Sequence, residues 1–431
     1  MKYLAKGSPK LVFAWSFYDW ANSVYSLVIA STIFPIFYGA LFRQKGTDEI
    51  AFAGFSIQSE ALIPYATAFG FLIIAVISPL LSGIADYLGN KKSFMKFFCY
   101  LGSLSCMSLY FFSLENLWFS LLSYLFALIG FWGSLVFYNS YLPDIAPKDQ
   151  QDRVSAKGYS LGYIGSVILL LICLAMVLLV PENQAIQMMR FSFLLVGIWW
   201  LGFSQYTYKY LPNFKNNNKL HWDILFNGFL ELQKVGRLIQ QIQPLKRYLT
   251  AFFVYSMAVQ TIMLIAAYFG EKEVQWGSDS KRTIGLIVSI LVIQLVAIFG
   301  AWITSKLVEK YGNIGVLVFL NFLWILICAY AYFIITPNDF YIAAFCVGLV
   351  MGGIQSLSRS TYSKLIPAES KDTTSFFSFY DVAEKIGIVF GMFTYGFVAE
   401  ITGRIQNAIL FLILFFVVGL LLLLRVPKSK I

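Results

Sequence analysis

The chain has 431 residues, of which 59% are hydrophobic and 13% charged, and its mean hydropathy is +0.71. Soluble domains carry about 25% charged residues, so this composition excludes a soluble globular protein and indicates an integral membrane protein. The formal net charge is +10, but the Lys and Arg residues lie in short segments between apolar runs and form no basic stripe. We therefore expect no nucleic-acid partner.

One histidine and five cysteines leave little material for catalytic or metal chemistry. The cysteines lie in apolar runs without CxxC spacing, which predicts packing residues rather than disulfides or a zinc site. A Ser-His-Asp site would depend on His221, which lies in a polar stretch. No G-x-x-x-x-G-K-[ST] loop for ATP is present in the sequence. We expect no enzyme activity, no metal and no cofactor.

Twelve apolar runs are each long enough for a membrane span, which needs about 20 residues. The first run exceeds that length, which predicts a helix that tilts or bends near Pro35. It is also too long for a signal peptide and no A-x-A site follows, so we expect it to remain uncleaved. In chain order the runs are 11–42, 61–83, 94–113, 116–140, 158–180, 187–211, 247–270, 283–305, 314–335, 339–358, 374–399 and 408–424.

Lys and Arg concentrate in alternate connecting segments, whereas Asp and Glu divide evenly between the two sets. The positive-inside rule then places both termini in the cytoplasm. The longest hydrophilic stretch, 212–246, separates an N-terminal bundle (1–211) from a C-terminal bundle (247–431). Part of this linker has helical apolar spacing and predicts an amphipathic helix on the cytoplasmic interface. The apolar residues at that spacing are Trp222, Leu225, Phe229, Leu232, Ile239 and Ile242.

Two sequence echoes relate the halves. "SGIADYLGNKK" (82–92) corresponds to "SKLVEKYGNIG" (305–315), and "YLPDIAP" (141–147) to "YSKLIP" (362–367). The prediction is an all-α integral membrane fold with twelve transmembrane helices in two pseudo-symmetric six-helix bundles. In transporters built from such repeats, the substrate site lies at their interface near the middle of the membrane.

The stretch 82–92 also resembles the cytoplasmic loop G-x-L-x-D-[RK]-x-G-[RK]-[RK] of the major facilitator superfamily. The matching residues are Asp86, Gly89, Lys91 and Lys92, with Glu309 and Gly312 in a degenerate second copy. Ser82 and Tyr87 depart from the pattern. Gly89 permits a positive φ for a tight turn, and Asp86 can accept backbone donors at a neighbouring helix N-terminus. We interpret the loop as a conformational lock; the alternative is a basic turn that only sets topology.

A polar stripe runs along the first span. Trp15, Asp19, Asn22 and Ser26 are spaced i, i+4, i+7 and i+11, which puts them on one helix face. An Asp at the centre of a membrane helix costs about 2.5–3.5 kcal/mol on insertion scales. We therefore expect this face to line the bundle interior or a water-filled cavity.

"YDWANSVY" (18–25), "GGIQSLSRSTYSKLIP" (352–367) and "FFSFYDVAEKIGIVFG" (376–391) resemble the autophagy-related vacuolar amino-acid effluxer family and its bacterial relatives. This family is a branch of the major facilitator superfamily, and the resemblance covers both halves. It implies export of small organic solutes, which are amino acids in the fungal members. The short linker fits the bacterial branch, which implies the inner membrane; superfamily habit implies a monomer.

The run 374–399 carries Asp381, Glu384 and Lys385 at i, i+3 and i+4, so that all three can meet on one side of a helix. With Asp19 they are our candidates for proton or charge coupling. We expect Asp19, or Glu384, to pair with Lys385 in one conformation only. The alternative is a static pair that satisfies buried charges.

The resemblance implies that the first, fourth, seventh and tenth spans line the cavity. Candidate substrate contacts are then Asn22, Ser26, Tyr138, Asn139, Gln260 and Gln355. Their alternative role is hydrogen bonding between helices. Arg359 is expected either to steer an anionic group or to extend toward lipid phosphate.

These features predict a secondary active transporter that exports small organic solutes, with amino acids the leading class and proton coupling a further hypothesis. Its partners are then a small-molecule substrate, the lipid bilayer and protons. The alternative is a lipid or lysolipid flippase of the same fold, which the polar stripe disfavours. A membrane-embedded enzyme and a non-transporting sensor rank lower, since neither a catalytic constellation nor a signalling domain is evident.

Overall fold

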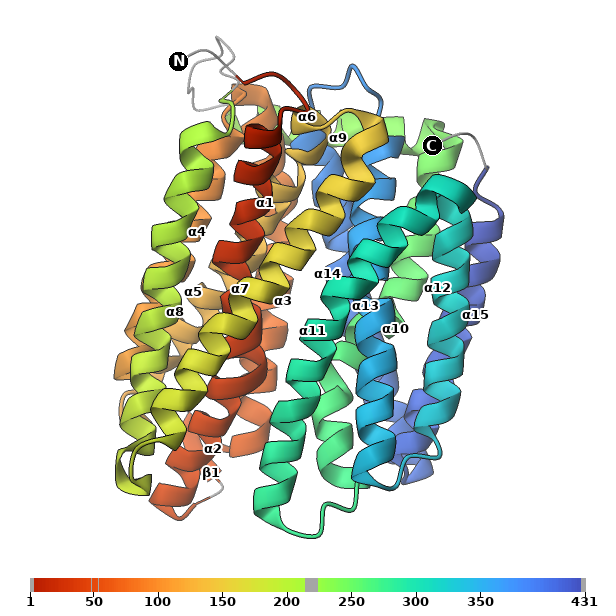
Figure 1. Cartoon of the computed structure of the whole chain (residues 1–431). Coiled ribbons are helices and arrows are strands. Elements are labelled where there is room, and N and C mark those ends of the chain that lie inside the picture. Colours follow the sequence, from red (N-terminus) through yellow and green to blue (C-terminus); the bar gives the residue numbers. More distant parts are fainter. Residues whose placement is uncertain (1–3, 48, 53, 214–223, 428–431) are drawn as a thin grey trace.

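A computed structural model describes residues 4–427 apart from positions 48, 53 and 214–223 (Figure 1). Within these residues, twelve helices are long and apolar enough to cross a membrane. The expected twelve spans are confirmed. The predicted Trp222 of the linker lies outside the described residues.

The N-terminal half contains the first six spans. Its elements are α1 (Pro9–Val24), the π-helix Tyr25–Ile33, α2 (Phe34–Lys45), β1 (Glu49–Phe52), β2 (Phe55–Gln58), α3 (Ser59–Leu88), α4 (Lys91–Ser108), α5 (Leu117–Asn139), α6 (Leu142–Ile145), α7 (Gln151–Leu178) and α8 (Glu182–Tyr210). The two strands pair as a short antiparallel hairpin, which the expectation of an all-helical chain had missed.

The first span is continuous from Pro9 to Lys45 but changes register in the middle. Its π-helical segment ends at Ile33, directly before α2, where Pro35 occupies the first turn. Proline lacks an N–H and its ring displaces the carbonyl four residues earlier. A π-helical turn accommodates both effects inside a long helix, so the irregularity expected at Pro35 takes this form.

The C-terminal half contains the other six spans and follows α9 (Ile224–Gln241) of the linker. Its helices are α10 (Gln243–Glu273), α11 (Asp279–Tyr311), α12 (Asn313–Ala331), α13 (Pro337–Leu365), α14 (Thr373–Thr402) and α15 (Ile405–Leu424). The start of α1 and the end of α15 lie at the same end of the bundle (Figure 1). We call this end, which holds the start of α1 and the end of α15, the terminal face.

Each half has its own hydrophobic core. One cluster of buried side chains includes Trp15 and Trp200 and comes from the N-terminal helices. The other includes Trp324 and Phe416, whose rings stack at 5.6 Å between centroids. Because apolar side chains are packed mainly within each half, each bundle can keep its internal packing while its contacts with the other bundle change.

The linker helix α9 packs against both halves, on α3 and on α14. Gly228 lies against Ile84 of α3, and Val235 is fully buried. Phe226 and Phe229, by contrast, are 62% and 53% exposed. The predicted linker helix is confirmed; its location at the membrane interface stays a prediction.

Candidate functional site

The two halves are joined at the terminal face by the loop that sequence analysis singled out. Asp86, near the end of α3, accepts backbone hydrogen bonds from Thr374 and Ser375 in the first turn of α14, at 3.2 and 2.6 Å. These two N–H groups have no partner inside their own helix. The predicted contact of Asp86 with a neighbouring helix N-terminus is therefore confirmed, and it crosses the boundary between the halves.

Gly89 has the predicted positive φ, and Gly312 of the second loop copy has one as well. Gly89 has φ 65° and Gly312 has φ 72°, in the region that favours glycine. The charged residues behave less uniformly. Lys92 donates to Leu211 O at 2.9 Å within its own half. Glu309 instead makes exposed ion pairs with Arg153, at 3.6 Å, and with Lys306, at 3.9 Å.

Two buried lysines complete the junction. Lys91 pairs with Asp144 in its own half and donates to Thr373 Oγ1 in the other at 2.9 Å. Lys364 of α13 pairs with Asp152 of α7 across the boundary. Asp144 and Lys364 lie in the echoed stretches "YLPDIAP" and "YSKLIP". The repeat was therefore a signal for these contacts, although it did not show which groups pair.

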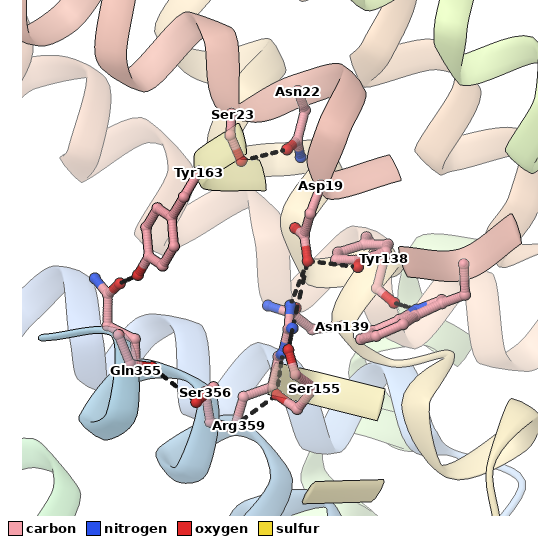
Figure 2. A network of polar contacts seen from close by, with 12 residues as sticks. Asp19, Asn22, Ser23, Tyr138, Asn139, Ser155, Tyr163, Gln355, Ser356 and Arg359 are labelled. Carbon is pink, nitrogen blue, oxygen red and sulfur yellow. Dashed lines mark hydrogen bonds and ion pairs between the residues drawn. The ribbon is translucent and has the colours of Figure 1, made fainter. Parts of the chain in front are cut away.

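Deeper in the bundle, Arg359 of α13 reaches across to the N-terminal half (Figure 2). Its Nη1 and Nη2 each donate to Asp19 Oδ2 at 3.3 Å. Tyr138 donates to the same oxygen at 2.7 Å, and Asn139 accepts from Nη1 at 3.2 Å. Ser155 accepts from Nε and from Nη2, each at 2.9 Å. The Arg359 side chain is 2% exposed and that of Asp19 6%.

Aromatic rings enclose this ion pair. The Arg359 guanidinium carbon lies 4.8 Å from the Trp15 ring centroid and 4.3 Å from that of Tyr159. Such cation–π contacts add stabilisation when water is excluded. The helices approach closely here because α7 carries glycine at position 158. A Cβ at that position would meet Asp19 Oδ2 and lie 3.0 Å from Arg359 Nη2.

This arrangement bears on two alternatives that the sequence left open. Either Asp19 or Glu384 was expected to pair with Lys385, and in this structure Glu384 does so. Asp19 pairs with Arg359 in this structure and not with Lys385, because α13 and α7 bring Arg359 directly onto the polar face of α1. Arg359 also does not extend toward lipid phosphate, since its side chain is buried between the halves. Ser155 and Tyr159 were missed. Ser155 precedes the apolar run 158–180 and Tyr159 lies within it, and neither residue gave a separate signal in the sequence.

Asp381, Glu384 and Lys385 form a second charged cluster on α14. Lys385 Nζ lies 2.9 Å from Asp381 Oδ1 and 2.8 Å from Glu384 Oε2. It also lies 3.7 Å above the Trp132 ring of α5, in the N-terminal half. The i, i+3, i+4 spacing thus brings the three groups together as predicted.

A small cavity lies beside this cluster. Its aromatic lining comes from Tyr159, Phe252, Tyr255 and Tyr380, and its polar lining from Ser256, Gln260, Gln355, Ser358 and Glu384. Gln260 donates to Glu384 Oε1 at 2.7 Å, and Gln355 accepts from Tyr163 of α7 at 2.9 Å. The cavity therefore combines aromatic faces, amides and one carboxylate.

The six predicted substrate contacts divide into two groups. Gln260 and Gln355 line the cavity. Tyr138 and Asn139 belong instead to the Arg359 network, and Asn22 is buried beside Ser23 (Figure 2). Ser26 is exposed on the first span. Helical spacing placed Asn22 and Ser26 on one face with Asp19, but it could not show how deep in the bundle each would lie.

The architecture matches solved transporter structures. FucP, a major facilitator superfamily transporter in an outward conformation, shares 16% sequence identity with a TM-score of 0.70, over 98% of this chain and 99% of that one. The human organic anion transporter MFSD10 shares 12% identity with a TM-score of 0.67, over 96% and 100% of the two chains. These similarities establish the fold.

The fold and the relatives together identify a transporter of the major facilitator type rather than an enzyme. The MFS-type transporter YxiO of Bacillus subtilis (strain 168) is 34% identical over 428 residues, which span 96% of this chain and 94% of YxiO. Autophagy-related protein 22 of Eremothecium gossypii is 24% identical over 95% of this chain and 89% of its own length. The chain belongs to the family described as "Vacuole effluxer Atg22 like", whose model matches residues 7–430.

Proposed function

We propose that this transporter exports small organic solutes, with amino acids the leading class, by alternating access coupled to protons. In this mechanism the 1–211 and 247–431 bundles rock about a central site, while the 212–246 linker connects them. The protein resides in a bacterial inner membrane as a monomer, with both termini in the cytoplasm. Export is supported by the word effluxer in the family description.

The observation that carries the proposal is the buried pair between Arg359 and Asp19. The two residues belong to different bundles and are almost fully enclosed. Taking two such charges out of water costs several kcal/mol per ion, which only good mutual geometry offsets. A contact of this kind favours the state in which the halves meet, and separating the halves would return both charges to water. It is therefore suited to bias one of two conformations.

The terminal-face contacts support the same mechanism. Asp86 on the α14 N-terminus and Lys364 on Asp152 join the halves where both termini lie. In our proposal these contacts, with Gly89 and Gly312 shaping the turns, lock the transporter closed toward the cytoplasm. Asp19, Asp381 and Glu384 are the proposed proton-coupling carboxylates, and Gln260 and Gln355 the proposed substrate contacts.

Flux into proteoliposomes tests the proposal. Purified protein under an imposed pH gradient is offered a mixed amino-acid pool, and wild type is compared with Asp19→Asn. We expect selective, gradient-dependent accumulation that the variant loses. Asp149→Asn is the matched control, because Asp149 is exposed on the terminal face. Accumulation that ignores the gradient would refute proton coupling. If no amino acid accumulates but labelled lysolipid changes leaflet, the flippase alternative replaces this proposal.

A further inference from the structure

The charges around the central cavity do not balance, and this imbalance identifies a class of substrate. The inference rests on the proposed transport function and adds the class of substrate to it. Two positively charged side chains lie deep in the bundle near the cavity, Arg359 and Lys385. Whether either can receive a ligand depends on how many of its donors are already used.

Arg359 has no donor to spare. A guanidinium carries five N–H donors, and the structure gives it five hydrogen bonds: two to Asp19, two to Ser155 and one to Asn139. One negative charge, that of Asp19, neutralises it. A substrate carboxylate could bind Arg359 only by displacing these partners.

Lys385 is also fully engaged. Its ammonium contacts Asp381 at 2.9 Å, Glu384 at 2.8 Å and the face of Trp132 at 3.7 Å, and its side chain is 1% exposed. Two carboxylates therefore share one ammonium, which leaves a net charge of −1 in this cluster. Because buried charge that is not compensated is costly, one more positive charge would stabilise the cluster.

The carboxylates also have unused acceptor sites. An ionised carboxylate offers about four lone-pair positions. Glu384 accepts from Gln260 and Lys385, one bond on each oxygen. Asp381 Oδ2 is buried, and within the described part of the chain it has no hydrogen-bond partner. Of the two residues, Glu384 is the one that lines the cavity, so a ligand in the cavity meets its carboxylate.

The remaining lining suits a cation. Tyr159, Phe252, Tyr255 and Tyr380 surround the cavity beside Glu384, and the face of an aromatic ring attracts ammonium groups within about 6 Å of its centre. The cavity has a volume of about 20 Å³, which is room for an ammonium group alone. We propose that it binds the ammonium group of an organic amine substrate, with Glu384 as its counter-ion, and that the aromatic rings move apart to enclose the hydrocarbon part. A substrate with an anionic group alone is excluded by the same charges.

Equilibrium binding to the purified full-length protein tests the site. The probes are phenethylamine, which is cationic at neutral pH, and 3-phenylpropionate, which has a similar size and shape but is anionic. Titration calorimetry in detergent gives the affinity of each. We expect wild type to bind the amine and not the carboxylate. Because a hydrogen bond to a charged group is stronger than one between neutral groups, Glu384→Gln is expected to weaken amine binding at least about tenfold.

Glu400→Gln is the matched control, since it removes one carboxylate from an exposed position on the same helix. It is expected to bind the amine as wild type does. Equal amine affinity in Glu384→Gln would overturn the assignment. The assignment would also be overturned if wild type bound 3-phenylpropionate more tightly than phenethylamine. This comparison uses the wild-type protein alone and so does not depend on the folding of a variant.

Counterflow of radiolabelled phenethylamine in proteoliposomes separates this inference from the transport proposal. Exchange of the amine that Glu384→Gln loses supports both. Amine binding without counterflow of any solute leaves the site standing and refutes transport by the proposed route. Amino-acid flux in a protein that does not bind phenethylamine supports the transporter and overturns the ammonium site.

Discussion

Replacing Asp19 by Asn is expected to open the terminal face. The variant keeps the size of the side chain and its contact with Tyr138 but removes the charge that neutralises Arg359. The Arg359 side chain is 2% exposed and forms its ion pair with Asp19. As long as the halves remain together, the variant therefore holds an uncompensated buried cation.

The magnitude follows from that burial. Removing one partner of a buried pair costs about 3–5 kcal/mol. Since the new amide would still offer an oxygen to the guanidinium, we take the lower end, about 3 kcal/mol. At about 1.4 kcal/mol for each factor of ten, the equilibrium between closed and open terminal faces shifts about 10²-fold toward open. A closed population of about 99% would then fall to about half.

Distances between spin labels measure this shift. Ser93→Cys on α4 and Lys310→Cys on α11 place labels at exposed positions of the two halves on the terminal face. Cys346 is replaced by Ser, because it is partly exposed while the other native cysteines are buried. In lipid nanodiscs, we expect Asp19→Asn to move the distance distribution from a short to a longer component.

Two further variants make the test specific. Asp149→Asn changes the net charge by the same amount at an exposed site, and it should leave the distance distribution unchanged. Combining Asp19→Asn with Arg359→Gln removes both buried charges, so most of the short component should return. If Asp19→Asn alone gives the wild-type distribution, the buried pair does not hold the terminal face closed.

The same labels and simple stability assays test other contacts. Gly158→Ala, whose new Cβ would meet Asp19 and Arg359, should open the terminal face with an overpacking cost of about 1–3 kcal/mol. Gly202→Ala, whose new Cβ would have no atom within 4 Å, should leave the terminal face closed. If both variants open it equally, the close approach of the helices at Gly158 is contradicted. Asp86→Ala should shift the distances the same way, but by only about 0.5–2 kcal/mol, as for a lost helix cap. An unchanged distribution would remove Asp86 from the lock. The hydrogen bond from Lys234 to Asp372 raises the pKa of Lys234. The contact stabilises the fold at pH values below the pKa of Lys234 in the unfolded state, and its contribution is lost as the pH rises through the pKa in the folded state. Lys234→Gln should therefore melt at the wild-type temperature only at strongly alkaline pH. Because Lys234 is 57% exposed, the difference at neutral pH should stay under about 1 kcal/mol, and a larger one would contradict this account. A reporter that is active only in the cytoplasm should be active when it is fused to either terminus. Activity of a periplasmic reporter at the same position would contradict the predicted cytoplasmic termini.

The spans could be predicted from the sequence because hydrocarbon imposes one simple requirement, a run of apolar residues of sufficient length. Their ends could not. The apolar run 158–180 is part of a helix that begins at Gln151, and the run 339–358 is part of one that continues to Leu365. The extra turns lie beyond the apolar runs and carry Asp152 and Lys364, which join the halves. Hydropathy therefore misses the part of each helix where the bundles meet.

The charged residues could be recognised as important, but their partners could not be assigned. An Asp in a membrane helix must be compensated, which identified Asp19 from sequence. The choice between Arg359 and Lys385 depends on which helices cross at Gly158, and no local pattern contains that information. Where partners lie on one helix, as with Asp381 and Lys385, spacing alone was sufficient.

Tyr159 gives a physical link between the two charged clusters. Its ring centroid lies 4.3 Å from the guanidinium carbon of Arg359, which forms the ion pair between the halves. The same residue lines the cavity that Glu384 and Gln260 also border. A ligand that occupies the cavity therefore contacts a side chain that packs on Arg359. Since Tyr159 belongs to α7 and Arg359 to α13, any movement of the ring to accommodate a ligand changes a contact between the two bundles. In the proposed cycle, a bound amine would in this way alter the stability of the pair that holds the bundles together, which is the coupling that alternating access requires.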